Sequence, residues 1–122
     1  MRWTDLEDGP AVVLLVPLGS LEQHGPALGM ATDALIAARV TRDAASHLAG
    51  ADRRFLVAPT VPYGASGEHE GFPGTVSIGT EALRLLLDGI TDFENRFSWK
   101  PSFACSSVRW IDGSLCEMNT PI

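Results

Sequence analysis

The hydrophobic positions of this chain alternate between short continuous runs and longer helical periodicities. Residues 11–18 form an apolar, β-branched run that is typical of a strand buried on both faces of a parallel sheet. Apolar residues then recur at helical spacing over 32–49, which predicts a helix that Thr32 caps and Gly50 ends. A second apolar run over 55–61 predicts another strand, and an amphipathic stripe over 80–93 predicts a second helix. This order indicates an α/β fold.

The predicted elements do not make a complete sheet. A sheet of two parallel strands joined by a right-handed crossover cannot cover the apolar faces of two helices. Further strands must come from the C-terminal segment, from residues outside this sequence, or from a partner chain. The two long loops, 19–31 and 62–79, leave the carboxyl ends of the strands and hold nearly all of the chemically capable side chains. Open α/β sheets bind their ligands at this edge.

The composition changes abruptly along the chain. Residues 1–92 contain no Cys, Asn or Lys, whereas residues 93–122 hold both Cys, both Asn and the only Lys. The later segment has neither helical nor alternating periodicity, so we predict no element in it. Two interpretations stay open: an ordinary aromatic-rich segment, or a divergent tail that follows a frame change or truncation. We therefore predict one unit over 1–92 and a separate tail over 93–122.

Charge and hydropathy exclude several classes of protein. The chain has 122 residues, a net charge of −6 and 45% hydrophobic residues, and this acidic balance argues against a nucleic-acid partner. The run over 11–18 is shorter than the roughly 20 residues that a membrane span needs, and the N-terminus lacks a signal-peptide pattern. Cys105 and Cys116 form neither a disulfide framework nor a zinc spacing. We expect a folded cytoplasmic protein without a membrane or nucleic-acid partner.

The first loop brings a carboxylate and an imidazole close together in the sequence. Glu22 and His24 are two residues apart in a chain that leaves a strand, where such residues project to the same side. Asp33 follows in the first turn of the predicted helix, where the helix dipole favours a carboxylate. This donor set suits zinc, manganese or iron. The structural alternative places both acids near helix amides and His24 in a turn.

The second loop carries a further imidazole between two acids. Adjacent side chains of an extended chain point to opposite sides, so Glu68 and His69 both bind one ion only with a special turn, which the loop glycines can supply. We expect Glu68 with Glu70, or His69 alone, to line a pocket. His47, inside the first predicted helix, is expected at the surface or in an interface, without a chemical role.

Two motifs combine these residues. They are PLGSLEQHGP over 17–26 with Thr32 and Asp33, and YGASGEH over 63–69 with FPGTVSIG over 72–79. In this order and spacing they resemble the N-terminal half of the creatininase (creatinine amidohydrolase) family, over about residues 11–92. The resemblance implies a three-layer α/β/α sandwich of the creatininase type, incomplete in this chain, that usually forms a homo-oligomer.

The resemblance also implies a metal-dependent hydrolase. In that family the corresponding Glu, His and Asp bind two metal ions, with the Asp bridging them; carried over, these residues are Glu22, His24 and Asp33. Two ions polarise an amide carbonyl, so the implied reaction hydrolyses the C–N bond of a small amide or a peptide. In one branch of the family a modified precursor peptide loses a C-terminal dipeptide. The loop with Glu68 and His69 is assigned to substrate contact or assembly.

Some family features are absent from the sequence. A third motif of the Asn-Gly-His-Gly-Gly-Asn type should follow the second helix, and a later Glu should complete the second metal site, yet no histidine follows Asp92. The leading hypothesis is therefore a truncated or frame-shifted amidohydrolase; the family binds two ions, and we expect this chain to bind one or none. The alternatives are a non-catalytic fragment that oligomerises through its incomplete sheet, and a gene product without function.

Overall fold

The computed structural model describes residues 11–50, 53–91 and 100–105. In chain order, its elements are β1 (Ala11–Leu18), α1 (Thr32–Leu48), β2 (Arg53–Val57), the 3-10 helix η2 (Gly67–His69), α2 (Gly79–Thr91) and β3 (Lys100–Cys105). The α/β alternation predicted from the hydrophobic pattern is confirmed. The short helix η2 and the strand β3 are additions to it.

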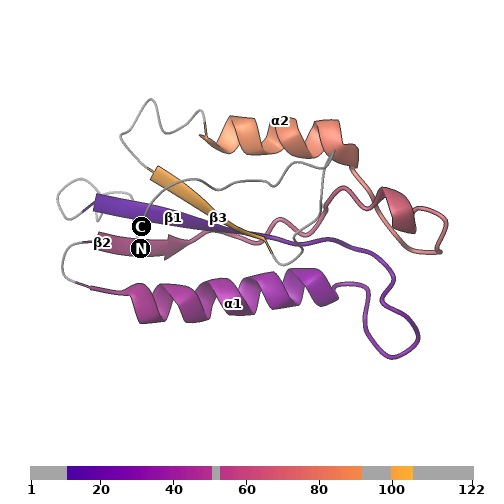
Figure 1. Ribbon diagram of the computed structural model, residues 1–122, viewed down its shortest axis with the longest axis horizontal. Coiled ribbons are helices and arrows are strands. Elements are labelled where there is room, and N and C mark those ends of the chain that lie inside the picture. Colours follow the sequence, from indigo (N-terminus) through magenta and orange to yellow (C-terminus); the bar gives the residue numbers. More distant parts are fainter. Residues whose placement is uncertain (1–10, 51–52, 92–99, 106–122) are drawn as a thin grey trace.

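The three strands form a parallel sheet in the order β2-β1-β3. The chain moves from β1 to β2 in one direction and from β2 to β3 in the other, so right-handed crossovers place the helices on opposite faces. Figure 1 shows this arrangement, with α1 on one side of the sheet and α2 on the other. The three-layer α/β/α architecture follows, and the apolar run of β1 forms its central strand.

The third strand comes from a segment for which we predicted no element. Lys100–Cys105 pairs with β1 in the register Val13↔Lys100 to Leu18↔Cys105. Half of its residues, Lys100, Pro101 and Ala104, are of types depleted in strands, so backbone pairing with β1 creates a strand that the pattern does not reveal. The C-terminal segment is thus one source of the missing strands. The remainder of the predicted tail, 93–99 and 106–122, lies outside the described residues.

The second strand ends earlier than the pattern predicted, at Val57 instead of residue 61. The amide of Ala58 donates to Leu15 O and that of Val61 donates to Pro17 O, both at 2.9 Å. From Ala58 to Val61 the chain after β2 advances three residues, whereas β1 advances only two, so the regular pairing is interrupted. Pro59, which lacks an N–H to donate, lies within this interruption. The pairing resumes as a single bridge between Leu18 and Val61.

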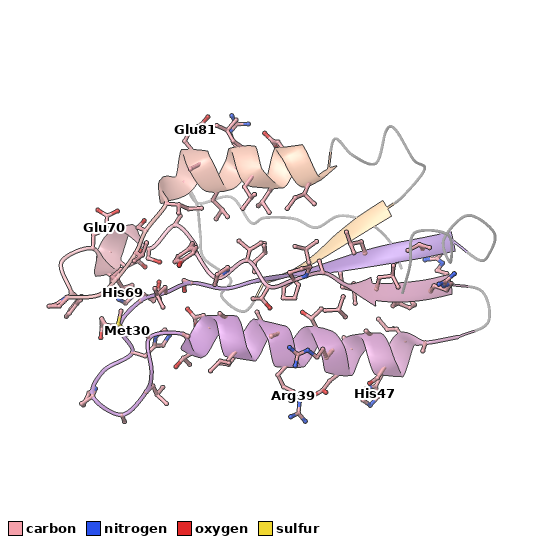
Figure 2. The ribbon with its side chains drawn as sticks, turned by 180° about the vertical axis from the view of Figure 1, so that it is seen from behind. Met30, Arg39, His47, His69, Glu70 and Glu81 are labelled. Carbon is pink, nitrogen blue, oxygen red and sulfur yellow. The ribbon has the colours of Figure 1, made fainter. Side chains whose placement is uncertain are left out.

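The first helix packs small side chains on the sheet. Ala34, Ala37 and Thr41 are its buried residues and share one helical face, opposite the apolar centre of β1. On the outer side, Figure 2 shows Arg39 and His47 pointing away from the sheet. His47 is exposed, and its Nδ1 lies 2.7 Å from the Asp43 carbonyl oxygen. The predicted surface position of His47 is confirmed.

The caps predicted for this helix are wrong. Ala31 is the N-cap, without a side-chain cap hydrogen bond, and Thr32 is the first helical residue. The Thr32 hydroxyl donates to Gly29 O, so it closes the preceding turn and does not accept a helix amide. At the other end the helix stops at Leu48 and Ala49 turns extended, with ψ of 121°, before Gly50 is reached.

The second helix spans Gly79–Thr91 and presents a strongly apolar stripe. Leu83, Leu87 and Ile90 are half-buried, whereas Leu86, predicted on the same face, stays 39% exposed. Within the described ranges, neither of the two α-helices is long and apolar enough to span a bilayer.

Candidate metal centre

The two long loops meet at one edge of the sheet. Both leave the carboxyl ends of parallel strands, and Figure 1 shows them at the same end of the molecule. Gly19 N donates to Val61 O at 2.9 Å, and Val76 N donates to Leu21 O at 2.9 Å in an antiparallel bridge. The start of the first loop is therefore hydrogen-bonded to the segment that follows β2. β2 and β3 lie on opposite sides of β1, so the chain connections change direction at β1. The carboxyl end of β1 is therefore a topological switch point, where α/β sheets bind ligands.

A close backbone approach positions the start of α1 beside the first loop. A Cβ on Gly19 would lie 2.4 Å from Ala34 Cα, a distance that no real side chain tolerates. Gly25, with φ of 71°, turns the loop back, and Glu22 N then donates to Met30 O at 3.1 Å. This loop closure carries Asp33, which precedes Ala34, next to the residues that follow β1.

The predicted ligand residues converge in this fold. Glu22, His24 and Asp33 each offer a donor atom, and these atoms lie within 4.8 Å of one another. Glu22 is buried, and His24 and Asp33 are half-buried. Two carboxylates held together out of water are costly unless positive charge compensates them. The arrangement therefore favours a bound cation.

The tautomer of His24 supports the same conclusion. Its Nδ1 lies 3.0 Å from the Glu22 carbonyl oxygen, which can only accept, so Nδ1 carries a hydrogen and donates it. The other nitrogen, Nε2, lies 3.1 Å from Asp33 Oδ1. In a neutral ring Nε2 is itself an acceptor, so a proton or a cation is needed between the two atoms. The hydrogen bond to the Glu22 backbone raises the pKa of His24; desolvation opposes this, and the Asp33 carboxylate adds to it.

Ser20 holds the other oxygen of Asp33. Its buried hydroxyl donates a short hydrogen bond to Asp33 Oδ2. Outer partners of this kind orient a ligating carboxylate and tune its basicity. Sequence reasoning did not single out Ser20, although it lies inside the motif that contains Glu22 and directly follows the glycine that contacts Ala34.

The second loop contributes one residue to this cluster. His69 Nε2 lies 3.5 Å from Glu22 Oε1, and His69 Nδ1 lies 3.0 Å from the side-chain nitrogen of Gln23, which the sequence also did not indicate. Glu68 and Glu70 are exposed and lie outside the one candidate ligand group found among the described residues. Figure 2 shows His69, the last residue of η2, at this end of the molecule together with Met30 and Glu70.

Fold and cluster together define an α/β/α sandwich with a candidate divalent-metal centre at the carboxyl edge of its parallel sheet. Residues 1–96 match the family described as Creatininase: Creatinine amidohydrolase, and the chain belongs to this family. The resemblance carried by the two loop motifs is thereby confirmed.

A curated relative matches the N-terminal part of the chain. It is the mycofactocin precursor peptide peptidase of Mycolicibacterium smegmatis, which is 63% identical over 76 residues; these are 62% of this chain and 31% of the relative. The matched region therefore spans about a third of that peptidase. The homologues are hydrolases that act on amide bonds, as the names amidohydrolase and peptidase state.

Solved creatininases share the fold. A mutant creatininase superimposes with a TM-score of 0.71 at 27% identity, over 87% of this chain and 43% of the other. A structure named Creatininase Mn gives a TM-score of 0.70 at 26% identity, with the same coverage of both chains. The creatininase-type sandwich predicted from the motifs is confirmed, and this chain spans less than half of it. The second of these names also states that manganese belongs to that protein.

Proposed function

We propose that this chain carries part of a metal-dependent amidohydrolase centre, in which Glu22, His24 and Asp33 bind a divalent cation. One observation carries the proposal: the three donor atoms lie within 4.8 Å of one another, around a buried carboxylate. The reaction is hydrolysis of a C–N amide bond. When bound, the cation supplies the Lewis acidity that makes an amide carbonyl a better electrophile.

The donor set fits such a cation. Two carboxylates and one imidazole suit zinc, manganese or iron. His24 donates its Nδ1 hydrogen to a backbone carbonyl, which is the usual arrangement for a metal-binding histidine, and so presents Nε2 as the ligand atom. Asp33 presents Oδ1 toward His24 while Ser20 holds Oδ2. Asp33 would hold the ion together with Glu22 and His24, and Ser20 would keep its carboxylate in place.

The substrate class is argued from the surroundings of the cluster and from the relative. The ring of Phe72, which is 49% exposed, packs beside the ring of His69 next to the cluster. Met30, in the first loop, is half-buried. Such apolar side chains suit a peptide. We propose that the substrate is a precursor peptide, as the name of the relative states, and that a C-terminal dipeptide is removed from it. Cytoplasmic location and a homo-oligomeric state belong to the same proposal.

Metal titration of the purified chain tests the centre directly. We expect wild-type protein to bind Mn²⁺ or Zn²⁺ in calorimetry, and Asp33→Asn to weaken the affinity by at least about tenfold, because it removes a ligand charge. Asp43→Asn, an exposed acid on the same helix, is the matched control and should change nothing. Unchanged metal content in Asp33→Asn would overturn the ligand assignment. Hydrolysis of creatinine and of a precursor peptide is assayed in parallel.

A non-catalytic oligomerisation module is the second candidate function. Large apolar side chains are exposed on both helices, among them Leu35 at 69%, Val40 at 57% and Leu85 at 57%. Large apolar side chains left exposed on a helix are candidates for contact with another chain. Light scattering after size exclusion separates the candidates, since a clean monomer that binds metal contradicts the module and a metal-free oligomer favours it.

A further inference from the structure

We propose that His69 is a positioning residue that holds the Glu22 carboxylate, through a chain of contacts that begins at the backbone of the first loop. The inference rests on the proposed function, because it takes Glu22 as a metal ligand. It assigns a specific task to one residue of the second loop. It also predicts which nitrogen of the His69 ring carries the hydrogen.

The chain of contacts begins at Gly25. Its backbone N–H donates to the side-chain oxygen of Gln23 at 2.9 Å. A backbone amide can only donate, so the Gln23 atom that faces it must be the carbonyl oxygen. The opposite orientation would place the amide NH₂ of Gln23 against another donor. The orientation of the Gln23 amide is therefore defined by the backbone.

This orientation defines the tautomer of His69. The amide nitrogen of Gln23 lies 3.0 Å from His69 Nδ1, and it has hydrogens to donate, so Nδ1 is the acceptor. A neutral His69 then carries its hydrogen on Nε2. That atom lies 3.5 Å from Glu22 Oε1, so an N–H group faces a carboxylate oxygen. The other tautomer would bring a lone pair against that oxygen.

The contact between His69 Nε2 and Glu22 Oε1 is largely shielded from water. The side chains of His69 and Glu22 are 22% and 9% exposed, so water screens their interaction weakly. At 3.5 Å the contact is longer than an ordinary hydrogen bond, yet it orients the carboxylate toward the cluster. The Phe72 ring packs beside the His69 ring, with 6.2 Å between their centroids. With its Nε2 hydrogen in place, His69 acts as a donor to a ligand and not as a ligand itself.

Nitrogen NMR of the metal-free chain tests the tautomer without any use of activity. In ¹⁵N-histidine-labelled protein at alkaline pH, we expect the His69 ring to show a protonated Nε2 and an unprotonated Nδ1. Gln23→Glu replaces the donor amide by an acceptor, so it should draw a hydrogen onto Nδ1. A wild-type ring with its hydrogen on Nδ1, or a tautomer unchanged by Gln23→Glu, would overturn the inference.

A pair of substitutions separates hydrogen donation from packing. His69→Phe keeps a ring beside Phe72 but removes the donor, and should weaken Mn²⁺ binding by about tenfold. His69→Gln places an amide nitrogen near the former Nε2 and should retain affinity within about threefold of wild type. Glu70→Gln, an exposed neighbour on the same loop, is the control. Circular dichroism confirms that each variant is folded.

The outcomes distinguish this inference from the proposed function. Equal Mn²⁺ affinity of His69→Phe and wild type would overturn the positioning role. A ¹⁵N shift showing His69 Nε2 bound directly to the ion would do the same, since it makes His69 a ligand. If wild type binds no metal, the proposed function fails, while the tautomer measurement still decides whether Gln23 and His69 form the chain of contacts.

Discussion

The loops after β1 and β2 leave the same sheet edge, yet they contribute differently to the candidate metal centre. The first supplies Glu22 and His24 and delivers Asp33 at the helix that follows, all from one short stretch of chain. The second supplies only His69, while its neighbouring acids are exposed. Both ends of the first loop are fixed, one by a strand and the other by the start of a helix, so its side chains can be directed toward one point. A loop that runs across it mainly covers and orients them.

The close approach of Gly19 to α1 offers the strongest way to break the first loop. Gly19→Ala places a Cβ 2.4 Å from Ala34 Cα, so the strand end and the helix must separate. We expect a loss of about 1–3 kcal/mol or more in the free energy of unfolding, together with loss of metal binding. Urea denaturation measures the first effect and calorimetry the second.

Gly29→Ala is the matched control for that experiment. Nothing lies within 4 Å of a Cβ at Gly29, and its backbone is not left-handed. It should therefore retain both stability and metal affinity. If the two variants behave alike, the close packing of the first loop on α1 does not position the cluster.

A smaller effect is expected from the hydroxyl that orients Asp33. Ser20→Ala removes the hydrogen bond to Asp33 Oδ2 at a buried position while leaving all three proposed ligands in place. We expect Mn²⁺ affinity to fall by about tenfold. Ser46→Ala, whose exposed hydroxyl bonds the Asp43 carbonyl on α1, should leave affinity unchanged. A Ser20→Ala variant with wild-type affinity would remove Ser20 from the centre.

The smallest effect is expected from an acid of the second loop. Glu68→Gln removes an exposed carboxylate next to His69, outside the ligand cluster. We expect its Mn²⁺ affinity to stay within about threefold of wild type, in contrast to His69→Phe. A large loss in calorimetry would mean that the second loop supplies a ligand, and the two loops would then be equivalent partners in the site.

The residues of the site that could be predicted were those that lie close together in the sequence. Glu22 and His24 are two residues apart and Asp33 lies in the first turn of α1, so one loop closure brings their donor atoms together. The contributions of Ser20, Gln23 and His69 could not be read in the same way. Each depends on a neighbour that pairing and loop closure bring close, as in the 46-residue separation between Gln23 and His69.

The same division applies to the fold. The strand Ala11–Leu18 and the cores of both helices are readable from apolar periodicity, because burial of an element requires that pattern. The cap assigned to Thr32 was wrong because its hydroxyl donates to the preceding turn, a contact set by the loop. The strand Lys100–Cys105 carries no pattern of its own and exists through its pairing with β1.

By itself, the sequence determined the α/β order and the family through two loop motifs, and it nominated Glu22, His24 and Asp33 as candidate metal ligands. Only the tertiary structure decided that the two loops meet, that Asp33 is held by Ser20, and that His69 faces Glu22. The physical reason is that side-chain chemistry and periodicity are local properties of the chain. Distances between segments arise when strands pair, helices pack and backbones approach as closely as Gly19 permits.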